Sequence, residues 1–265
     1  MHASGGLLQD HQGNVSYGAM IDWPTLEGLL ARPTLGVGAA LVLLCALAWL
    51  ELATGMTHPA LAWQAVDVGA AFLMWLAMAV AMMLPTAAPA ILAFADLSRG
   101  AGQARESAGP LGAFVGGYLI AWWAFGVLAT ATQWALAVAA RGVPGLAAGG
   151  SVAGALLLVA GLYQFSAIKD LCLTRCRSPL AFFLAHWRAG TRGALYLGLR
   201  HGAHCVGCCW ALMALMLCVG TMNIGWTAAL TALMLAEKLL PGGRLVGRTV
   251  GLVLIAWGSY LLIPA

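Results

Sequence analysis

Five of the ten residues from His201 to Trp210 carry side chains that bind soft or borderline metal ions: His201, His204, Cys205, Cys208 and Cys209. Two further thiols, Cys172 and Cys176, precede this segment and lie four residues apart. Thiolate and imidazole groups are the usual ligands of copper and zinc in proteins. Their density in so short a segment predicts a metal site more readily than it predicts packing.

Helical spacing suggests how these side chains combine, because residues three and four apart share a face of a helix. One stripe would give a mixed imidazole and thiolate site from His201, His204 or Cys205, and Cys208. A second, slightly rotated stripe is purely sulfur and consists of Cys205, Cys209, Met213 and Met216. Cys172 and Cys176 would also point the same way if their segment is helical. The two cysteine groups could then converge on one ion, which the sequence leaves open.

The composition identifies the solvent around these elements. Hydrophobic residues make up 62% of the 265 positions and charged residues only 8%, whereas a soluble domain has roughly 25% charged residues. We therefore predict an all-α, polytopic transmembrane bundle whose first partner is the lipid bilayer. The net charge of +4 forms no basic stripe interleaved with aromatic residues, so no nucleic-acid partner is expected.

Hydropathy divides the chain into an N-terminal segment, residues 1–33, which we expect to be interfacial or loosely ordered, and one transmembrane domain, residues 34–265. About seven spans are predicted, at 34–53, 67–94, 111–138, 151–168, 194–221, 224–239 and 246–263. This arrangement places 12 of the 13 Lys and Arg residues on one side. The positive-inside rule then predicts a cytoplasmic N-terminus. The Cys/His-bearing loop, residues 169–209, would lie at the cytoplasmic face.

Two smaller features complete the pattern. Ser178-Pro179 is typical of the start of a helix, and the apolar residues after it predict a short helix lying in the membrane interface. Glu237 and Lys238, near the inner end of the sixth span, are expected to pair with one another or to face water.

The ligand types favour copper over zinc. Thiolate and thioether groups select Cu(I), zinc or iron–sulfur clusters, a cytoplasmic face keeps thiols reduced, and several methionines surround the cysteines. The first hypothesis is a protein that binds and delivers a soft metal, with a metal donor or acceptor protein as partner. A membrane oxidoreductase with the metal as redox centre and a non-catalytic protein with structural zinc are the alternatives. Whether the protein is an enzyme, and its oligomeric state, stay open.

Three stretches resemble a bacterial family of predicted metal-binding integral membrane proteins, a domain family of unknown function. They are YQFSAIKDLCLTRCRSPLAFFLAHWRAGTRG at 163–193, HGAHCVGCCWALMALMLCVGTMNIGW followed by EKLLP, and MWLAMAVAMMLPTAAP at 74–89. The resemblance covers roughly residues 65–262. It implies a multi-pass protein of the bacterial inner membrane and metal binding at Cys172, Cys176, His201, Cys205, Cys208 and Cys209. The family varies at position 204, so the resemblance does not extend to His204.

Overall fold

The computed structural model describes residues 32–55, 65–98, 108–142, 150–219 and 224–263. Within these ranges the chain is helical and contains no strand, which confirms the all-α prediction. The predicted N-terminal segment 1–33 lies almost entirely outside them. The helices are α2 (Arg32–Gly55), α3 (Ala65–Met78), the π-helix η1 (Ala79–Met83), α4 (Leu84–Ser98), α5 (Ala108–Gly142), α7 (Gly150–Tyr163), α8 (Ala167–Arg177), α9 (Pro179–His186), α10 (Gly190–Ala214), α11 (Met216–Val219), α12 (Ile224–Leu239) and α13 (Gly243–Leu262).

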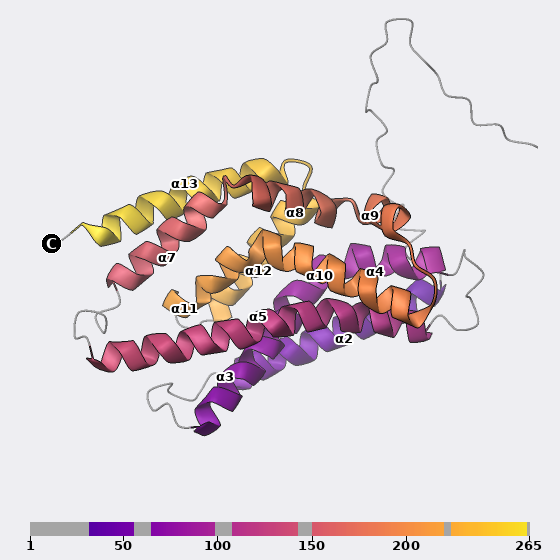
Figure 1. The fold of residues 1–265 in the computed structure, drawn as a ribbon, viewed down its shortest axis with the longest axis horizontal. Coiled ribbons are helices and arrows are strands. Elements are labelled where there is room, and N and C mark those ends of the chain that lie inside the picture. The colour runs from indigo at the N-terminus through magenta and orange to yellow at the C-terminus, as the bar shows by residue number, and fades with distance from the viewer. Residues whose placement is uncertain (1–31, 56–64, 99–107, 143–149, 220–223, 264–265) are drawn as a thin grey trace, which may run out of the picture.

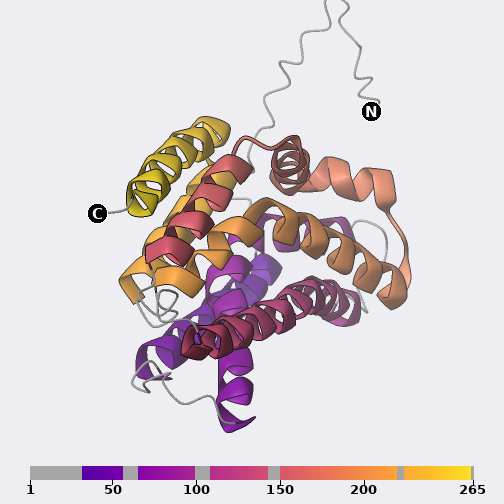
Figure 2. The same ribbon diagram turned by 60° about the vertical axis from the view of Figure 1, so that its left-hand side comes forward.

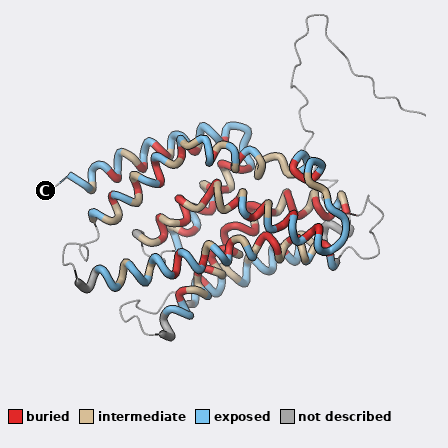
Figure 3. Tube along the Cα trace, viewed as in Figure 1, coloured by how far each residue is buried: buried red, intermediate tan, exposed pale blue. Residues whose placement is uncertain are grey.

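Two long helix pairs lie side by side in the bundle. Helix α10 lies along α5, and α13 lies along α7 (Figures 1 and 2). Helices α8 and α9 run over α10, as Figure 1 shows, and α12 lies between the two pairs. Buried residues concentrate in the middle helices, whereas the outer helices carry exposed positions (Figure 3). The centre of the bundle, where α10 meets its neighbours, is therefore the most deeply buried part of the molecule.

Four described helical segments are long and apolar enough to cross a membrane: Gly36–Thr54, Val68–Ser98, Gly109–Ala139 and Gly243–Leu262. A fifth would arise if α7 and α8, which meet at an angle of 64°, form one broken span. The predicted count of seven is not confirmed. Helix α12, for example, has 16 residues, fewer than the roughly 20 that a helix needs to cross the hydrocarbon core.

The π-helix η1 has a local cause in the sequence. Pro85 follows it closely and has no backbone N–H to donate to the preceding turn, which disturbs the regular hydrogen-bond ladder. The carbonyl of Ala81, four residues before this proline, instead accepts a hydrogen bond of 3.1 Å from Trp49 Nε1 on α2. π-Helical segments occur frequently at functional sites. This one ends at Met83, whose carbonyl faces the candidate site described below.

The break between α7 and α8 also follows from the sequence. Ser166 adopts an extended conformation, and its side chain accepts a hydrogen bond of 3.1 Å from the Lys169 backbone N–H. A side-chain oxygen in this position satisfies one of the free N–H groups at the start of a helix. Helix α8 therefore starts in a new direction. The predicted short helix after Ser178-Pro179 is confirmed as α9, with proline in its first turn.

Helices α5 and α10 touch through their backbones. A Cβ atom on Gly198 of α10 would overlap the carbonyl oxygen of Phe114, and one on Gly117 of α5 would overlap that of Leu195. Small residues permit such close approach between helices in a membrane. The contact fixes the position of the α10 segment that carries the cysteines.

We expect Gly198→Ala to destabilise the protein, because its Cβ meets backbone that cannot move aside. Overpacking typically costs about 1–3 kcal/mol. The measurement is the midpoint of thermal unfolding in detergent. Gly116→Ala is the matched control, since no atom lies within 4 Å of its added Cβ. Equal midpoints for the two variants would contradict the close α5–α10 contact.

Candidate metal centre

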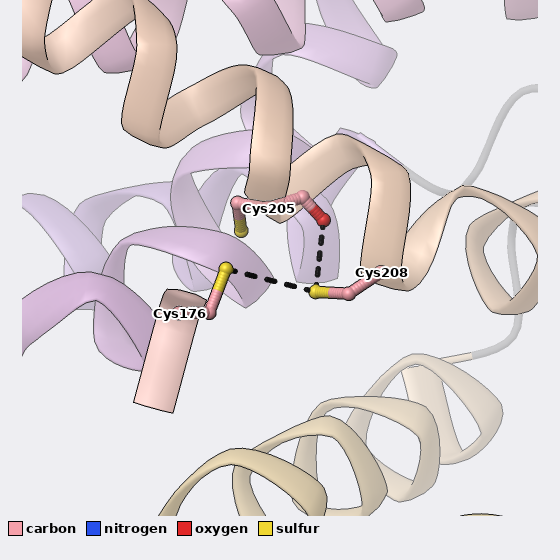
Figure 4. Close-up of side chains that lie close together, drawn as sticks. All are labelled: Cys176, Cys205 and Cys208. Carbon is pink, nitrogen blue, oxygen red and sulfur yellow. Dashed lines mark hydrogen bonds between the residues drawn. The ribbon is translucent and has the colours of Figure 1, made fainter. Parts of the chain in front are cut away.

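Three thiols from two helices converge in the interior. The sulfur atoms of Cys176 on α8 and of Cys205 and Cys208 on α10 all lie within 4.8 Å of one another. Figure 4 shows the three side chains turned toward a common point. The sulfur atoms of Cys176 and Cys208 are 3.9 Å apart, so the two cysteine groups of the sequence do meet. Cys205 and Cys208 are each 1% exposed, which places the group away from solvent.

The spacing of the sulfur atoms fits a single metal ion. Bonds of about 2.3 Å from one ion to three thiolates place the sulfur atoms about 4 Å apart. The distance of 3.9 Å between Cys176 and Cys208 matches this value. Helix geometry accounts for the α10 half of the group, because Cys205 and Cys208 are three residues apart and share a face. The fold accounts for the other half by laying α8 across that face.

The remaining sulfur residues proposed from the sequence lie outside the three-thiol group. Cys209 is buried and its sulfur lies 3.3 Å from that of Cys208, but it is not among the three that are mutually within 4.8 Å. Cys172 lies beside Gly207, where a Cβ would come within 2.7 Å of the Cys172 sulfur. Met213 is completely buried further along α10. Met216 contacts the hydroxyl of Thr227 at 3.7 Å.

The two histidines proposed from the sequence are not part of the three-thiol group. His201 is buried among the aromatic rings of Phe114, Tyr118, Phe182 and Phe183, and its Nδ1 has no hydrogen-bond partner. His204 Nε2 lies 3.1 Å from Arg175 Nη1 on α8. Helical spacing placed His201 on the same face as Cys205, but the aromatic residues of α5 and α9 surround its ring. The group that the fold brings together contains sulfur ligands alone.

A buried lysine contacts the group, and the sequence interpretation missed it. Lys238 near the end of α12 donates to Cys205 Sγ at 3.1 Å and to Thr86 Oγ1 at 2.7 Å. The expectation that Lys238 pairs with Glu237 or faces water is therefore wrong. Its side chain is buried because α12 enters the bundle interior at this end. The signal in the sequence was a lysine at the end of an apolar stretch, where a charged side chain is costly and is commonly functional.

Thr86, Met83 and Tyr118 close a ring of polar contacts with Lys238 and Cys205. Thr86 donates to the Met83 carbonyl at 2.8 Å, and the Tyr118 hydroxyl lies 2.9 Å from that carbonyl and 3.1 Å from Cys205 Sγ. The hydroxyl donates to the Met83 carbonyl, and in its contact with Cys205 Sγ either atom can be the donor. The ring joins η1, α4, α5, α10 and α12 and holds the Cys205 sulfur in one place.

A second buried charge network lies beside the first. The Lys169 ammonium contacts both Glu237 carboxylate oxygens, at 2.9 and 2.7 Å, and donates to the side-chain oxygen of Gln164. Lys169 and Glu237 are 2% and 1% exposed. Arg177 donates to the backbone carbonyls of Glu237, Leu240 and Pro241 and so caps the end of α12. These contacts connect α8, which carries Cys176, to α12, which carries Lys238.

Comparison with known proteins identifies the family of the chain. The model of a family described as PpoB2, copper chaperone, matches residues 72–261. The chain belongs to this family. The match spans the three thiols and Lys238, and it confirms the resemblance recognised in the sequence. Neither the curated proteins nor the solved structures contain a match to this chain.

A variant that keeps Cys176 and Cys208 as its only cysteines tests the convergence of α8 and α10. Mild oxidation with diamide should join them, because their sulfur atoms need a shift from 3.9 Å to about 2.05 Å. Mass spectrometry of proteolytic peptides would detect the cross-link. A variant that keeps only Cys45 and Cys208 is the control, since Cys45 lies on α2. Equal cross-linking in both variants would contradict the geometry.

Proposed function

We propose that this protein is a membrane-embedded copper chaperone that holds one Cu(I) ion on Cys176, Cys205 and Cys208 and passes it to another protein. The observation that carries the proposal is the convergence of three thiols from two helices within 4.8 Å. The copper-chaperone description of the family agrees with it. In this role the ion is cargo, so the site must both bind and release it.

The chemistry of the three ligands supports copper over zinc. Thiolates bind Cu(I), zinc and iron–sulfur clusters, so the number of ligands distinguishes between these ions. Structural zinc sites are almost always tetrahedral with four ligands, whereas the described residues offer three sulfur atoms that are mutually close. The nearby imidazoles of His201 and His204 lie against aromatic rings and Arg175 respectively. A three-sulfur environment with no nitrogen ligand therefore fits the described side chains best.

Membrane location is part of the same proposal. It is supported by four apolar helical segments of spanning length and by an exposed surface rich in large apolar side chains on α2, α5 and α13. Tyr118, which contacts Cys205, lies nine residues beyond the start of the Gly109–Ala139 segment, or about 14 Å along the helix axis. The cargo site would thus lie inside the bilayer, reached from the cytoplasmic side that the basic residues indicate.

Metal content provides the direct test. We expect protein purified in detergent without a histidine tag, from copper-supplemented cells, to contain about one copper per chain, since three thiolates complete one site. Cys176→Ser and Cys208→Ser should each lose most of it. Inductively coupled plasma mass spectrometry gives the stoichiometry, and X-ray absorption should show sulfur neighbours at about 2.3 Å.

Cys45→Ser is the matched control for the metal measurement, because it removes a thiol that lies outside the three-thiol group. It should retain the wild-type copper content. Zinc in place of copper would favour a structural site. Copper that stays bound while its absorption changes on reduction would favour a redox centre. Copper retained in both Cys176→Ser and Cys208→Ser would rule out the three-thiol site.

Orientation is tested at the two ends of α5. With the cytoplasmic N-terminus predicted from the basic residues, residues 99–107 lie inside and residues 143–149 lie outside. A cysteine introduced by Arg105→Cys should react with a membrane-impermeant maleimide only after the cells are opened. One introduced by Arg141→Cys should react in cells whose inner membrane is intact. The opposite pattern would reverse the topology, and equal labelling would contradict a spanning α5.

A further inference from the structure

The charge of Lys238 is not balanced by a carboxylate. Its ammonium is fully inside the bundle at 5% exposure, and a buried charge without a counter-charge is strongly destabilising. The neighbouring acid, Glu237, directs both carboxylate oxygens at Lys169. Among the described residues, the side-chain partners of Lys238 are a neutral hydroxyl, Thr86, and the sulfur of Cys205.

We infer that Lys238 is a specificity-determining residue of the thiol site: its fixed positive charge favours a monovalent ion over a divalent one. The inference rests on the proposed copper function, and it concerns which ion the site prefers. Three thiolates carry a charge of −3, so their complex with Cu(I) is −2 and their complex with Zn(II) is −1. A fixed positive charge stabilises the more negative complex more strongly.

The geometry makes this effect large. The Lys238 nitrogen is 3.1 Å from Cys205 Sγ, and an ion bound to that sulfur adds about 2.3 Å. The ion and the ammonium are then no more than about 5.4 Å apart, in an interior where charges are poorly screened. The hydroxyl of Thr86, itself bonded to the Met83 carbonyl, holds the ammonium in this position. The lysine therefore acts on the ion through space without being one of its ligands.

A second buried pair serves as an internal comparison. Lys169 and Glu237 are as deeply buried as Lys238, but their charges cancel. Removing both leaves the charge at the thiol site unchanged, whereas removing the charge of Lys238 alters it by one unit. The two changes separate an electrostatic role from a merely structural one.

The experiment measures Cu(I) and Zn(II) affinities of the purified full-length protein by competition with chromophoric chelators. In Lys238→Met the ratio of Cu(I) to Zn(II) affinity should fall by on the order of tenfold or more, the effect of one charge at this distance. Lys238→Arg keeps the charge and should stay within about threefold of the wild type. Lys169→Met combined with Glu237→Gln should also leave the ratio near the wild-type value.

Each outcome has a defined meaning. If Lys238→Met lowers both affinities equally, or changes neither, the selectivity role is overturned while copper binding by the thiols stands. If the wild-type protein binds no Cu(I), the proposed function itself fails and the inference falls with it. Should Lys238→Met not fold, as judged by gel filtration in detergent, Lys238→Gln removes the same charge with a polar side chain and takes its place.

Discussion

Among the described residues, three Lys and Glu side chains are buried inside a mostly apolar bundle, and the need to partner them constrains the arrangement around the site. Lys169 and Glu237 form a buried ion pair, and Lys238 is placed against Cys205. Removing one member of a buried pair typically costs 3–5 kcal/mol. The pair requires α8 to lie against α12, and the Lys238 contact requires α12 to lie against α10. These charge contacts therefore hold α8, and with it Cys176, beside the two thiols of α10.

The three thiols are held by different kinds of contact. Cys205 and Cys208 belong to α10, whose backbone is in direct contact with α5 through Gly198 and Gly117. Cys176 belongs to α8, a helix of 11 residues whose outer side is tied to α13 by contacts of Asp170 with Arg244 and Arg248 at 3.8 and 3.9 Å. Exposed ion pairs of this kind contribute about 0–1 kcal/mol.

How much was predictable from the sequence depended on whether a feature was local. The helical spacing of Cys205 and Cys208 placed two ligand atoms on one face, and Ser178-Pro179 marked the start of α9. The choice of Cys176 over Cys172 was not predictable, because it depends on the 64° bend after Tyr163. The position of His201 outside the thiol group likewise depends on tertiary packing, because aromatic rings from α5 and α9 surround it. Lys238 was interpreted as a solvent-facing or locally paired charge, although a lysine at the end of an apolar stretch is commonly functional. Its contact with Cys205 depends on how α12 packs against α10, which the local sequence does not specify.

The copper-chaperone function proposed above requires that a buried site release its ion. Two of the three sulfur residues are 1% exposed, so an ion held there cannot meet an acceptor while the bundle is closed. Cys176 is the partly exposed member and comes from the helix with the weaker outer contacts. Because the interior pair Lys169–Glu237 ties α8 to α12, any outward movement of Cys176 must stretch that pair. For the proposed chaperone, this arrangement keeps the ion on the two thiols of α10 while Cys176 moves away and leaves its ligand position to an acceptor.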